Sequence, residues 1–416
     1  MRLPKFTFGV GDRFAHEGAA QLNAVLKARE LGVRLAPVWN KSPLEHRLIG
    51  TGPRDVRAEA DAAAQLCHYD RTYFVDADQV TFDEVDDYIG PCNYFTLDVS
   101  GRIGERPDAD GVAQLLAWCE PYLGEVNLPG IDEPLTIERD QLAATTEAYL
   151  PAIEEAGRIC RHIAASKGED LFVTEVSLSR SDQPQTPAEL LVILAAIAQQ
   201  QIPAATIAPR LPGRFLKGID YIGDIEQFAT EFEQHVAVVA FATAEFGLPE
   251  GMKLSIHSAG DKFAVFPVMH DVLKRHEAGI HVKTSGTTWL EELTGLAEAG
   301  GEGLAVVKRI YRAAVGRIDE LCAPYASELE LDRDALPPAD TVDAHSGAQL
   351  ATMLRHDMDN PMCNPNVRQL LHVAYKVAAE MDRAFLAAVA DHHEVIARNV
   401  TENLLDRHIR PLLLGR

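Results

Sequence analysis

Short apolar runs that end in polar residues recur along the chain, with helical patterns between several of them. Runs rich in β-branched and aromatic residues span 7–13, 32–42, 72–78, 94–100, 171–179, 204–210, 253–262 and 280–288. Helical periodicity appears between them at 15–31, 55–67, 187–201, 224–246 and 289–299. This alternation predicts parallel strands joined by helical crossovers. Eight such strands favour a closed (β/α)8 barrel of the TIM type, although 325–329 could supply a late strand if one of the first two runs lies outside the barrel.

Two segments depart from this alternation. The interval 101–170 is long for one crossover and contains the turn-like stretches "GERPDADG" and "NLPGIDEP" before a helical pattern near 141–166. Residues 347–416 repeat apolar positions at i, i+3, i+4 and i+7 over many turns. We therefore expect one barrel domain over 1–416, with an insertion at 101–170 and a helical C-terminal extension at 347–416.

The charge balance narrows the choice of partners. The 416 residues include 39 basic and 62 acidic side chains, which give a net charge of −23. Such a surface repels nucleic acid and anionic lipid, so neither is an expected partner. No apolar run reaches the roughly 18–20 residues of a membrane span. An anionic substrate would need local cations or a metal ion, which draws attention to Arg210, Lys262 and Lys283.

The cellular setting follows from the N-terminus and the cysteines. The first residues, "MRLPKFTFGVGDR", do not form a signal peptide, and the six cysteines contain no CxxC pair. A reducing cytoplasm fits this pattern, and association into a homo-oligomer is left open.

The carboxyl ends of parallel barrel strands surround one mouth, so polar residues at several strand ends share a small space. His257 in "KLSIHSAGDK" and His281 in "IHVKTSG" occupy similar apolar contexts in two neighbouring runs. A single such histidine is more often a core or turn residue, whereas two on adjacent strands point towards metal ligands. Imidazoles and carboxylates together suit Mn, Fe, Co, Ni or Zn, although no HExxH motif is present.

Three acidic residues and one lysine are candidates for the chemistry. Asp76 and Asp78 in "FVDADQ" share one side of an extended strand, so either could be a general base, or Asp78 could cap a helix starting near 81. Glu175 lies inside an apolar run, where a carboxylate must meet a cation or metal ion or carry a proton. Lys283 could pair with Glu175, bind a substrate carboxylate or form a Schiff base.

Polar loops after the strands are candidates for substrate binding. Backbone amides in "SAGDK" and "KTSGTT" could cradle an anion, since helix N-termini bind carboxylate and phosphate. Simple N-capping by Thr287 or Thr288, with Glu291 completing a capping box from Thr288, is the alternative for the second stretch, and both interpretations can hold at once. The expected substrate-binding residues are Asp76, Arg210, Ser258, Asp261, Lys262, Thr284 and Ser285.

The stretches "FVDADQV", "TEVS", "KLSIHSAGDKF", "HVKTSGTTWLEEL", "RQLLHVAYKVAAEM" and "RHIRPLLLG" together resemble the tagaturonate epimerase family. The resemblance runs from about residue 70 to the C-terminus. It implies a metal-dependent barrel enzyme that interconverts D-tagaturonate and D-fructuronate. In the family pattern a histidine that looks like a metal ligand occupies the position of Gln79, and the residue matching Asp78 looks like the proton acceptor. Gln79 could offer a carbonyl oxygen, which is a poorer ligand for a borderline metal.

Three hypotheses for the function of the protein follow from these observations. The leading expectation is an epimerase that works by retro-aldol cleavage and re-addition, with Asp78, Glu175 and Lys283 as catalytic residues. His257, His281 and Gln79 would hold a divalent transition metal ion (Zn, Mn, Ni, Co or Fe). A metal-dependent aldolase or ketose isomerase on a related sugar or sugar acid is the second reading, and a catalytically silent sugar-acid-binding protein is the third.

The metal expectation can be tested on the purified protein. Elemental analysis should find bound Mn, Fe, Co, Ni or Zn, and the His257→Ala variant should lose it because an imidazole ligand is removed. Protein without a transition metal, and without any gain in activity when one is added, would contradict the expectation.

Overall fold

Eight parallel strands close into a barrel in the computed structural model, which describes residues 1–284 and 286–416. The strands follow each other around the barrel in the order β1-β10-β9-β8-β7-β4-β3-β2. They are β1 (Phe6–Val10), β2 (Leu35–Lys41), β3 (Phe74–Val80), β4 (Tyr94–Asp98), β7 (Val173–Ser177), β8 (Ala204–Ala208), β9 (Lys253–Ile256) and β10 (Ile280–Lys283). Each of the eight apolar runs supplies one strand, which confirms the barrel. The alternative of a late strand is wrong, because Ala323–Glu328 forms a 3-10 helix (η4).

Helices cross between successive strands on the outside of the barrel. They are α1 (Gly18–Glu30), α2 (Pro43–Ile49), α3 (Pro53–Leu66), α4 (Asp86–Ile89), α6 (Arg139–Lys167), α7 (Pro187–Gln199), α8 (Ile225–Glu245) and α9 (Phe266–Arg275). Local sequence sets several starts: Thr186 and Glu189 form a capping box before α7, with Pro187 in its first turn. Helix α7 is almost wholly buried, because α6 and α8 pack against it. None of the helices in the described residues has the length and apolar character needed to cross a membrane.

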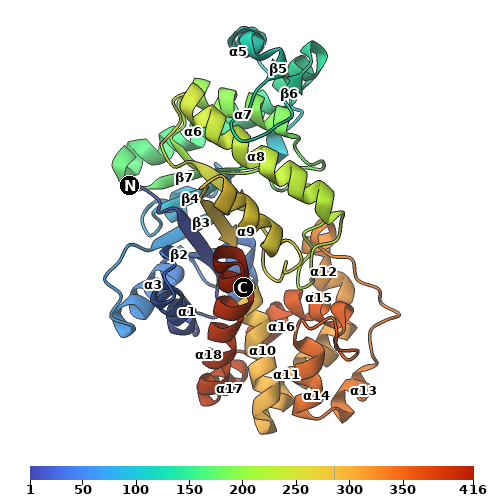
Figure 1. Cartoon of the computed structure of the whole chain (residues 1–416). Coiled ribbons are helices and arrows are strands. Elements are labelled where there is room, and N and C mark those ends of the chain that lie inside the picture. Colours follow the sequence, from blue (N-terminus) through green and yellow to red (C-terminus); the bar gives the residue numbers. More distant parts are fainter. Residues whose placement is uncertain (285) are drawn as a thin grey trace.

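The interval 101–170 divides into a projecting part and a crossover. Helix α5 (Ala109–Cys119) and the antiparallel hairpin of β5 (Gly124–Val126) and β6 (Leu135–Ile137) extend away from the barrel at the top of Figure 1. The 29-residue helix α6 then returns along the barrel and packs against α5 and α7. The segment of α5, β5 and β6 is therefore an addition to the (β/α)8 barrel, and α6 is the crossover helix between β4 and β7.

A helical C-terminal region covers one side of the barrel. Its helices are α10 (Thr287–Ala299), α11 (Gly301–Gly316), α12 (Ile318–Cys322), α13 (Ala339–Ala344), α14 (Gly347–Leu354), α15 (Pro365–Val373), α16 (Tyr375–Met381), α17 (Arg383–Asp391), α18 (His393–Glu402) and the closing segment η5 (Asn403–Leu414). Helix α18 packs on α1 and α10, and η5 packs on α9. At Gly295 a side chain would collide with Ile396, since a Cβ there would lie 2.8 Å from its Cγ1. The absence of a side chain at Gly295 thus lets α18 approach α10 closely.

The barrel interior changes from apolar to polar along its axis. A small apolar layer at the amino ends of the strands contains Ala36, Val38, Phe74, Tyr94 and Val173. Towards the carboxyl ends the inward positions become charged, including Asp76, Glu175 and Lys283, each of which is buried. The apolar layer closes one end of the barrel, so the charged groups open only towards the mouth.

A second group of buried acids lies outside the barrel strands, around the start of α1. Asp12 accepts hydrogen bonds from the backbone amides of Phe14, His16 and Glu17. Burial, and then the nearby charge of Asp12, raise the pKa of Glu17 to about 8. Glu17 is fully buried, and His393 lies at its edge with Nδ1 3.3 Å from Glu17 Oε1.

The raised pKa of Glu17 predicts a loss of stability at high pH. The pKa of Glu17 is 4.5 in the unfolded chain and about 8 in the folded protein. Between these two pH values the folded state holds a proton that the unfolded state has lost. The free energy of unfolding should therefore fall as pH rises across this interval. The Glu17→Gln variant should lose less stability between pH 6 and pH 9 in urea titrations, and the exposed Glu30→Gln on the same helix should behave as wild type. A Glu17→Gln profile as steep as the wild-type profile would contradict the prediction.

Candidate functional site

The centre of the barrel mouth is the Lys283 ammonium, which projects from β10 among oxygen atoms of three other strands. Its Nζ lies 2.8 Å from Asp76 Oδ2, 2.7 Å from Asp78 Oδ1 and 2.6 Å from Thr96 Oγ1. Glu175 Oε1 is 3.4 Å away. Burial disfavours the charged lysine, but the three carboxylates outweigh it and raise the pKa of Lys283 above its ordinary value. Lys283 is therefore a permanent cation that links β10 to β3, β4 and β7.

The three carboxylates around Lys283 differ in their protonation. Burial raises the pKa of Asp76 to about 7, against the opposing charge of Lys283. For Asp78, burial is outweighed by the charge of Lys283 and by the hydrogen bonds from Lys283 and Asn40, and the pKa is lowered. The same balance holds the pKa of Glu175 well below its ordinary value. Asp78 and Glu175 are thus ionised at neutral pH, whereas Asp76 is divided between its two forms.

Glu175 is held on both oxygens. Its Oε2 accepts hydrogen bonds from the Tyr94 hydroxyl and from Thr206 Oγ1, each 2.8 Å away. Its Oε1 lies 2.6 Å from Nε2 of His257. The buried carboxylate is therefore paired as the sequence requires, with a cation and an imidazole at Oε1 and two hydroxyl groups at Oε2.

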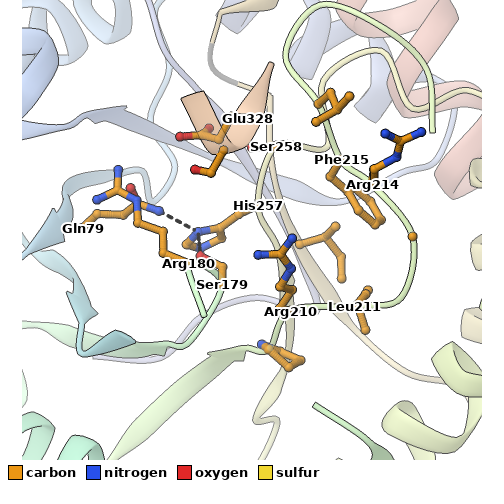
Figure 2. Close-up of a pocket in the computed structure, with 15 residues that line it drawn as sticks. Gln79, Ser179, Arg180, Arg210, Leu211, Arg214, Phe215, His257, Ser258 and Glu328 are labelled. Atoms are coloured by element: carbon orange, nitrogen blue, oxygen red, sulfur yellow. Dashed lines mark hydrogen bonds between the residues drawn. The ribbon is translucent and has the colours of Figure 1, made fainter. Parts of the chain in front are cut away.

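His257 joins this cluster to the open mouth. Its Nδ1 lies 3.1 Å from the Gln79 amide nitrogen and 2.9 Å from the Ser179 hydroxyl (Figure 2). A ring that accepts at Nδ1 and donates from Nε2 to Glu175 is the neutral Nε2–H tautomer, and these partners favour it. The basic nitrogen of His257 then faces the pocket, while Glu175 fixes the orientation of the ring.

The backbone at the mouth is unusual at two of these positions. Gln79 has φ of 59° and Ser258 has φ of 51°, in the left-handed region that non-glycine residues seldom adopt. Gln79 also lies where the pairing of β3 with β4 shifts register between Ala77 and Val80. Such irregularities re-aim side chains and are common next to active sites.

A pocket of about 150 Å³ lies over the His257 end of the cluster (Figure 2). Its walls include Gln79, Arg180, Arg210, His257, Ser258 and Glu328. A smaller recess of about 60 Å³ adjoins it, and there Asp78, Lys283 and Lys217 join His257. The predicted Asp78, Lys283, His257, Gln79, Arg210 and Ser258 thus line one mouth, with Asp76 and Glu175 directly beneath.

The second expected imidazole lies deeper. His281 is fully buried; its Nδ1 lies 2.9 Å from Thr7 Oγ1, and its Nε2 has no hydrogen-bond partner. Burial lowers the pKa of His281 to about 3, so the ring is neutral. Its register partners are Thr7 and Ser255, two positions below the level of Lys283 and His257.

The side chains do not fit the expected metal ion as they are arranged. Within the described part of the chain, no group of three or more His, Cys, Asp or Glu side chains could hold a metal ion. The Gln79 amide nitrogen faces His257, and the Lys283 ammonium lies among the carboxylates that would serve as further ligands. We therefore derive no step through a metal ion, and its presence stays a prediction.

The structure does not bring Asp261 and Lys262 to the mouth. Lys262 Nζ donates to the carbonyl oxygens of Leu216, Ile219 and Gly260, at 2.8, 2.7 and 2.8 Å. Asp261 is buried and paired with Arg368 of α15, with Oδ2 2.6 Å from Nη2. Asp261 ties the β9 loop to the C-terminal helices, and Lys262 ties it to the loop after β8, so both side chains brace the loop rather than face a substrate.

The loop after β10 also differs from expectation. Thr284 Oγ1 donates to the Gly9 carbonyl oxygen at 2.9 Å, so this hydroxyl is used within the barrel wall. Ser285 lies outside the described residues. The expected capping box is wrong: Gly286 is the N-cap of α10, and Thr288 Oγ1 accepts a hydrogen bond from Gln21. Asp78 does not cap a helix either, because α4 begins only at Asp86.

Four residues at the mouth have no sequence motif of their own. They are Ser179, Arg180, Lys217 and Glu328. The first two follow β7 directly, so the rule that site residues follow barrel strands could have found them. Lys217 lies in the long loop after β8, and Glu328 comes from η4. Their side chains form a 2.7 Å ion pair, which only the folded structure reveals.

Comparison with known proteins identifies the family. The sequence model of a family described as tagaturonate epimerase matches residues 1–410. The chain is 25% identical to a tagaturonate/fructuronate epimerase of Thermotoga maritima over 422 residues, covering 97% of this chain and 80% of the relative.

Solved structures support the same fold. The native crystal structure of the fructuronate-tagaturonate epimerase from Cohnella laeviribosi is similar at a TM-score of 0.81 and 23% identity, covering 99% of this chain and 82% of that chain. The crystal structure of a probable tagatose 6-phosphate kinase from Sinorhizobium meliloti 1021 gives a TM-score of 0.50 at 12% identity, covering 97% of this chain and 99% of that one. At these identities the likeness shows the fold alone.

The Asp261–Arg368 pair should be important for stability. Both side chains are buried, so Arg368→Met would leave a carboxylate unpaired and should lower the free energy of unfolding by roughly 3–5 kcal/mol in urea titrations. The control is Arg398→Met, whose exposed guanidinium lies 3.5 Å from Glu298 and whose loss should change little. Equal effects of the two substitutions would contradict a bracing role for Asp261.

Proposed function

The chain belongs to the tagaturonate epimerase family, and we propose that it interconverts D-tagaturonate and D-fructuronate by cleaving and re-forming one carbon–carbon bond. The family match over residues 1–410 and the curated relative that carries this activity support the substrate pair. The observation that carries the chemistry is the single cluster of Asp78, Lys283, Glu175 and His257 beneath an open pocket.

The two sugar acids require this type of reaction. They differ at a hydroxyl-bearing carbon that is β to the ketone, so its C–H bond is not acidic and enolisation cannot invert it. In a retro-aldol step a base takes the hydroxyl proton, and the bond to the neighbouring α-carbon breaks. The bonding electron pair becomes the enolate of the ketone fragment, and the other fragment becomes an aldehyde. The aldehyde turns its other face to the enolate, the bond re-forms, and the alkoxide recovers a proton, so no oxidant or reductant is needed.

Asp78 is the group that we assign as the proton acceptor. It lines the recess, and its lowered pKa keeps it ionised at neutral pH. Its Oδ2 accepts a hydrogen bond from Asn40 at 3.1 Å, and Oδ1 is held by Lys283. Both oxygens are thus oriented before a substrate arrives, which is what proton transfer at a fixed distance requires.

His257 is the second proton-transfer group, and it works with Glu175. Glu175 has no proton to give at neutral pH, because the charge of Lys283 and the hydrogen bond from His257 outweigh burial and hold its pKa well below the ordinary value. The neutral imidazole can accept a proton at Nδ1 on the pocket side while Glu175 stabilises the imidazolium that forms. Glu175 therefore contributes to proton transfer indirectly, by holding and stabilising the His257 ring.

Lys283 supplies positive charge where oxyanions develop. Its ammonium lines the recess beside Asp78 and His257, so an alkoxide or enolate oxygen bound there lies close to a fixed cation. The surrounding carboxylates keep this ammonium protonated by raising its pKa. A Schiff base needs an unprotonated amine, so the raised pKa argues against that role. A divalent transition metal ion with His257 among its ligands stays a prediction of the sequence, and none of these steps depends on it.

Product analysis with Asp78→Asn tests this proposal. The substitution removes the base but keeps the shape, so kcat on D-tagaturonate should fall by roughly 10²–10⁴-fold. The matched control is Asp83→Asn, an exposed carboxylate just beyond β3, which should keep wild-type kcat.

The products of the wild-type reaction separate the alternatives. In heavy water the inverted carbon should keep its own hydrogen, because the retro-aldol route never breaks that C–H bond. Released fragments from the wild-type protein would indicate an aldolase, and an aldose product would indicate an isomerase. Saturable binding of D-tagaturonate without turnover would identify a silent binding protein.

A further inference from the structure

Four cations other than Lys283 line the mouth, and they differ in how accessible they are to an anion. Arg214 is 48% exposed, but it pairs with Glu330 at 2.5 Å and lines the pocket without lining the recess. Lys217 is 16% exposed and paired with Glu328 at 2.7 Å. The Arg210 guanidinium donates to the Ser181 carbonyl oxygen within its own wall of the pocket. The Arg180 side chain is 44% exposed and lies 3.0 Å from Asp98 Oδ2. Arg180 thus presents an accessible guanidinium, and of these four cations it alone lines both the pocket and the recess.

Arg180 also lies where the cavities of the mouth meet. It lines the pocket with His257 and Gln79, the recess with Asp78 and Lys283, and a larger groove formed with residues that follow β4. In Figure 2 its side chain extends into the same part of the pocket as Gln79 and His257. The preceding residue, Ser179, is in contact with Nδ1 of His257. The short loop after β7 therefore carries both Ser179, which contacts the His257 ring, and the accessible Arg180 guanidinium.

The charge of the site makes such a cation necessary. Asp78, Asp98 and Glu328 all act electrostatically on Arg180, and the whole chain carries −23. An incoming carboxylate would be repelled by these acids unless a cation received it. A guanidinium suits this task because its planar fork can bind both carboxylate oxygens.

We propose that Arg180 binds the substrate carboxylate, releasing Asp98 as it does so, and that it holds the aldehyde fragment between cleavage and re-addition. This inference rests on the proposed function. In a tagaturonate or fructuronate molecule the carboxylate is separated from the inverting carbon by a single carbon, so it stays on the aldehyde fragment after the bond breaks. A cation beside Asp78 and His257 anchors that fragment while its carbonyl turns over. Arg180 is then the residue that selects sugar acids over neutral ketoses and keeps the cleaved pieces together.

Steady-state kinetics of Arg180→Met and Arg180→Lys test the proposal. Loss of a charge-assisted contact should raise KM for D-tagaturonate by at least ~10-fold in Arg180→Met. Arg180→Lys should recover part of the loss, since it keeps the charge but not the fork. The turnover of neutral D-tagatose, however slow, should be unchanged in kcat/KM, and free aldehyde fragment should accumulate from D-tagaturonate in Arg180→Met only.

Arg102→Met is the matched control. Arg102 is 45% exposed and pairs with Glu105 at 3.0 Å, much like Arg180 and Asp98, but it lies outside the pocket and the recess. It should leave KM unchanged. An unchanged KM in Arg180→Met, or an equal loss on D-tagatose, would overturn the assignment.

Calorimetric titration with D-tagaturonate separates this inference from the proposed function. If wild type binds the sugar acid without turning it over, the epimerase proposal fails, and an affinity at least ~10-fold weaker in Arg180→Met would still support the carboxylate site. If wild type turns the substrate over while Arg180→Met binds it equally well, only the Arg180 assignment fails. If wild type neither binds nor converts it, both are overturned.

Discussion

A single buried ammonium holds the charged interior of this barrel together. Removing a carboxylate from water costs several kcal/mol unless a cation or hydrogen-bond donors compensate it. Here Lys283 serves Asp76, Asp78 and Glu175 at once, and hydroxyl groups supply the remaining contacts. Burial raises the pKa of Asp76, and because one positive charge faces three acids Lys283 does not fully offset it, so Asp76 holds a proton part of the time. The protonation of the other groups at the mouth follows from this imbalance.

The mouth combines rigid and adjustable parts. Lys283 is paired in the barrel ladder, and Asp78 is held by hydrogen bonds from Asn40 and Lys283, so the groups assigned to proton transfer and charge stabilisation have fixed partners. Ser179 and Arg180 lie on a loop, and Glu328 arrives from the C-terminal region. That region is tied to the β9 loop through the Asp261–Arg368 pair, which connects the outer helices to the wall of the pocket.

Sequence reasoning succeeded where strand geometry alone decides the outcome. Period-two alternation places Asp76, Asp78 and Glu175 inside a barrel whenever the runs that contain them are strands, and all of those runs are. It failed for Asp261 and Lys262 because they lie beyond the strand end, where a left-handed turn at Ser258 and Asp261 directs the chain away from the mouth. Their partners could not be foreseen either: Arg368 is 107 positions later, and the carbonyl oxygens that bind Lys262 carry no side-chain signal. His281 shows a finer limit, since alternation gives its inward direction but not its depth along the barrel axis.

The bulge in β3 has a consequence for how this site can change. At residue 79 the direction of the side chain is set by a left-handed backbone and a shifted strand register, and neither depends on the amide group of glutamine. The backbone therefore presents residue 79 to His257, and side chains that tolerate its left-handed conformation can take this position. A replacement there changes which atom meets the imidazole without re-folding the strand. A substitution at residue 79 can thus change the contact to His257 while the ion pairs around Lys283 keep all of their members.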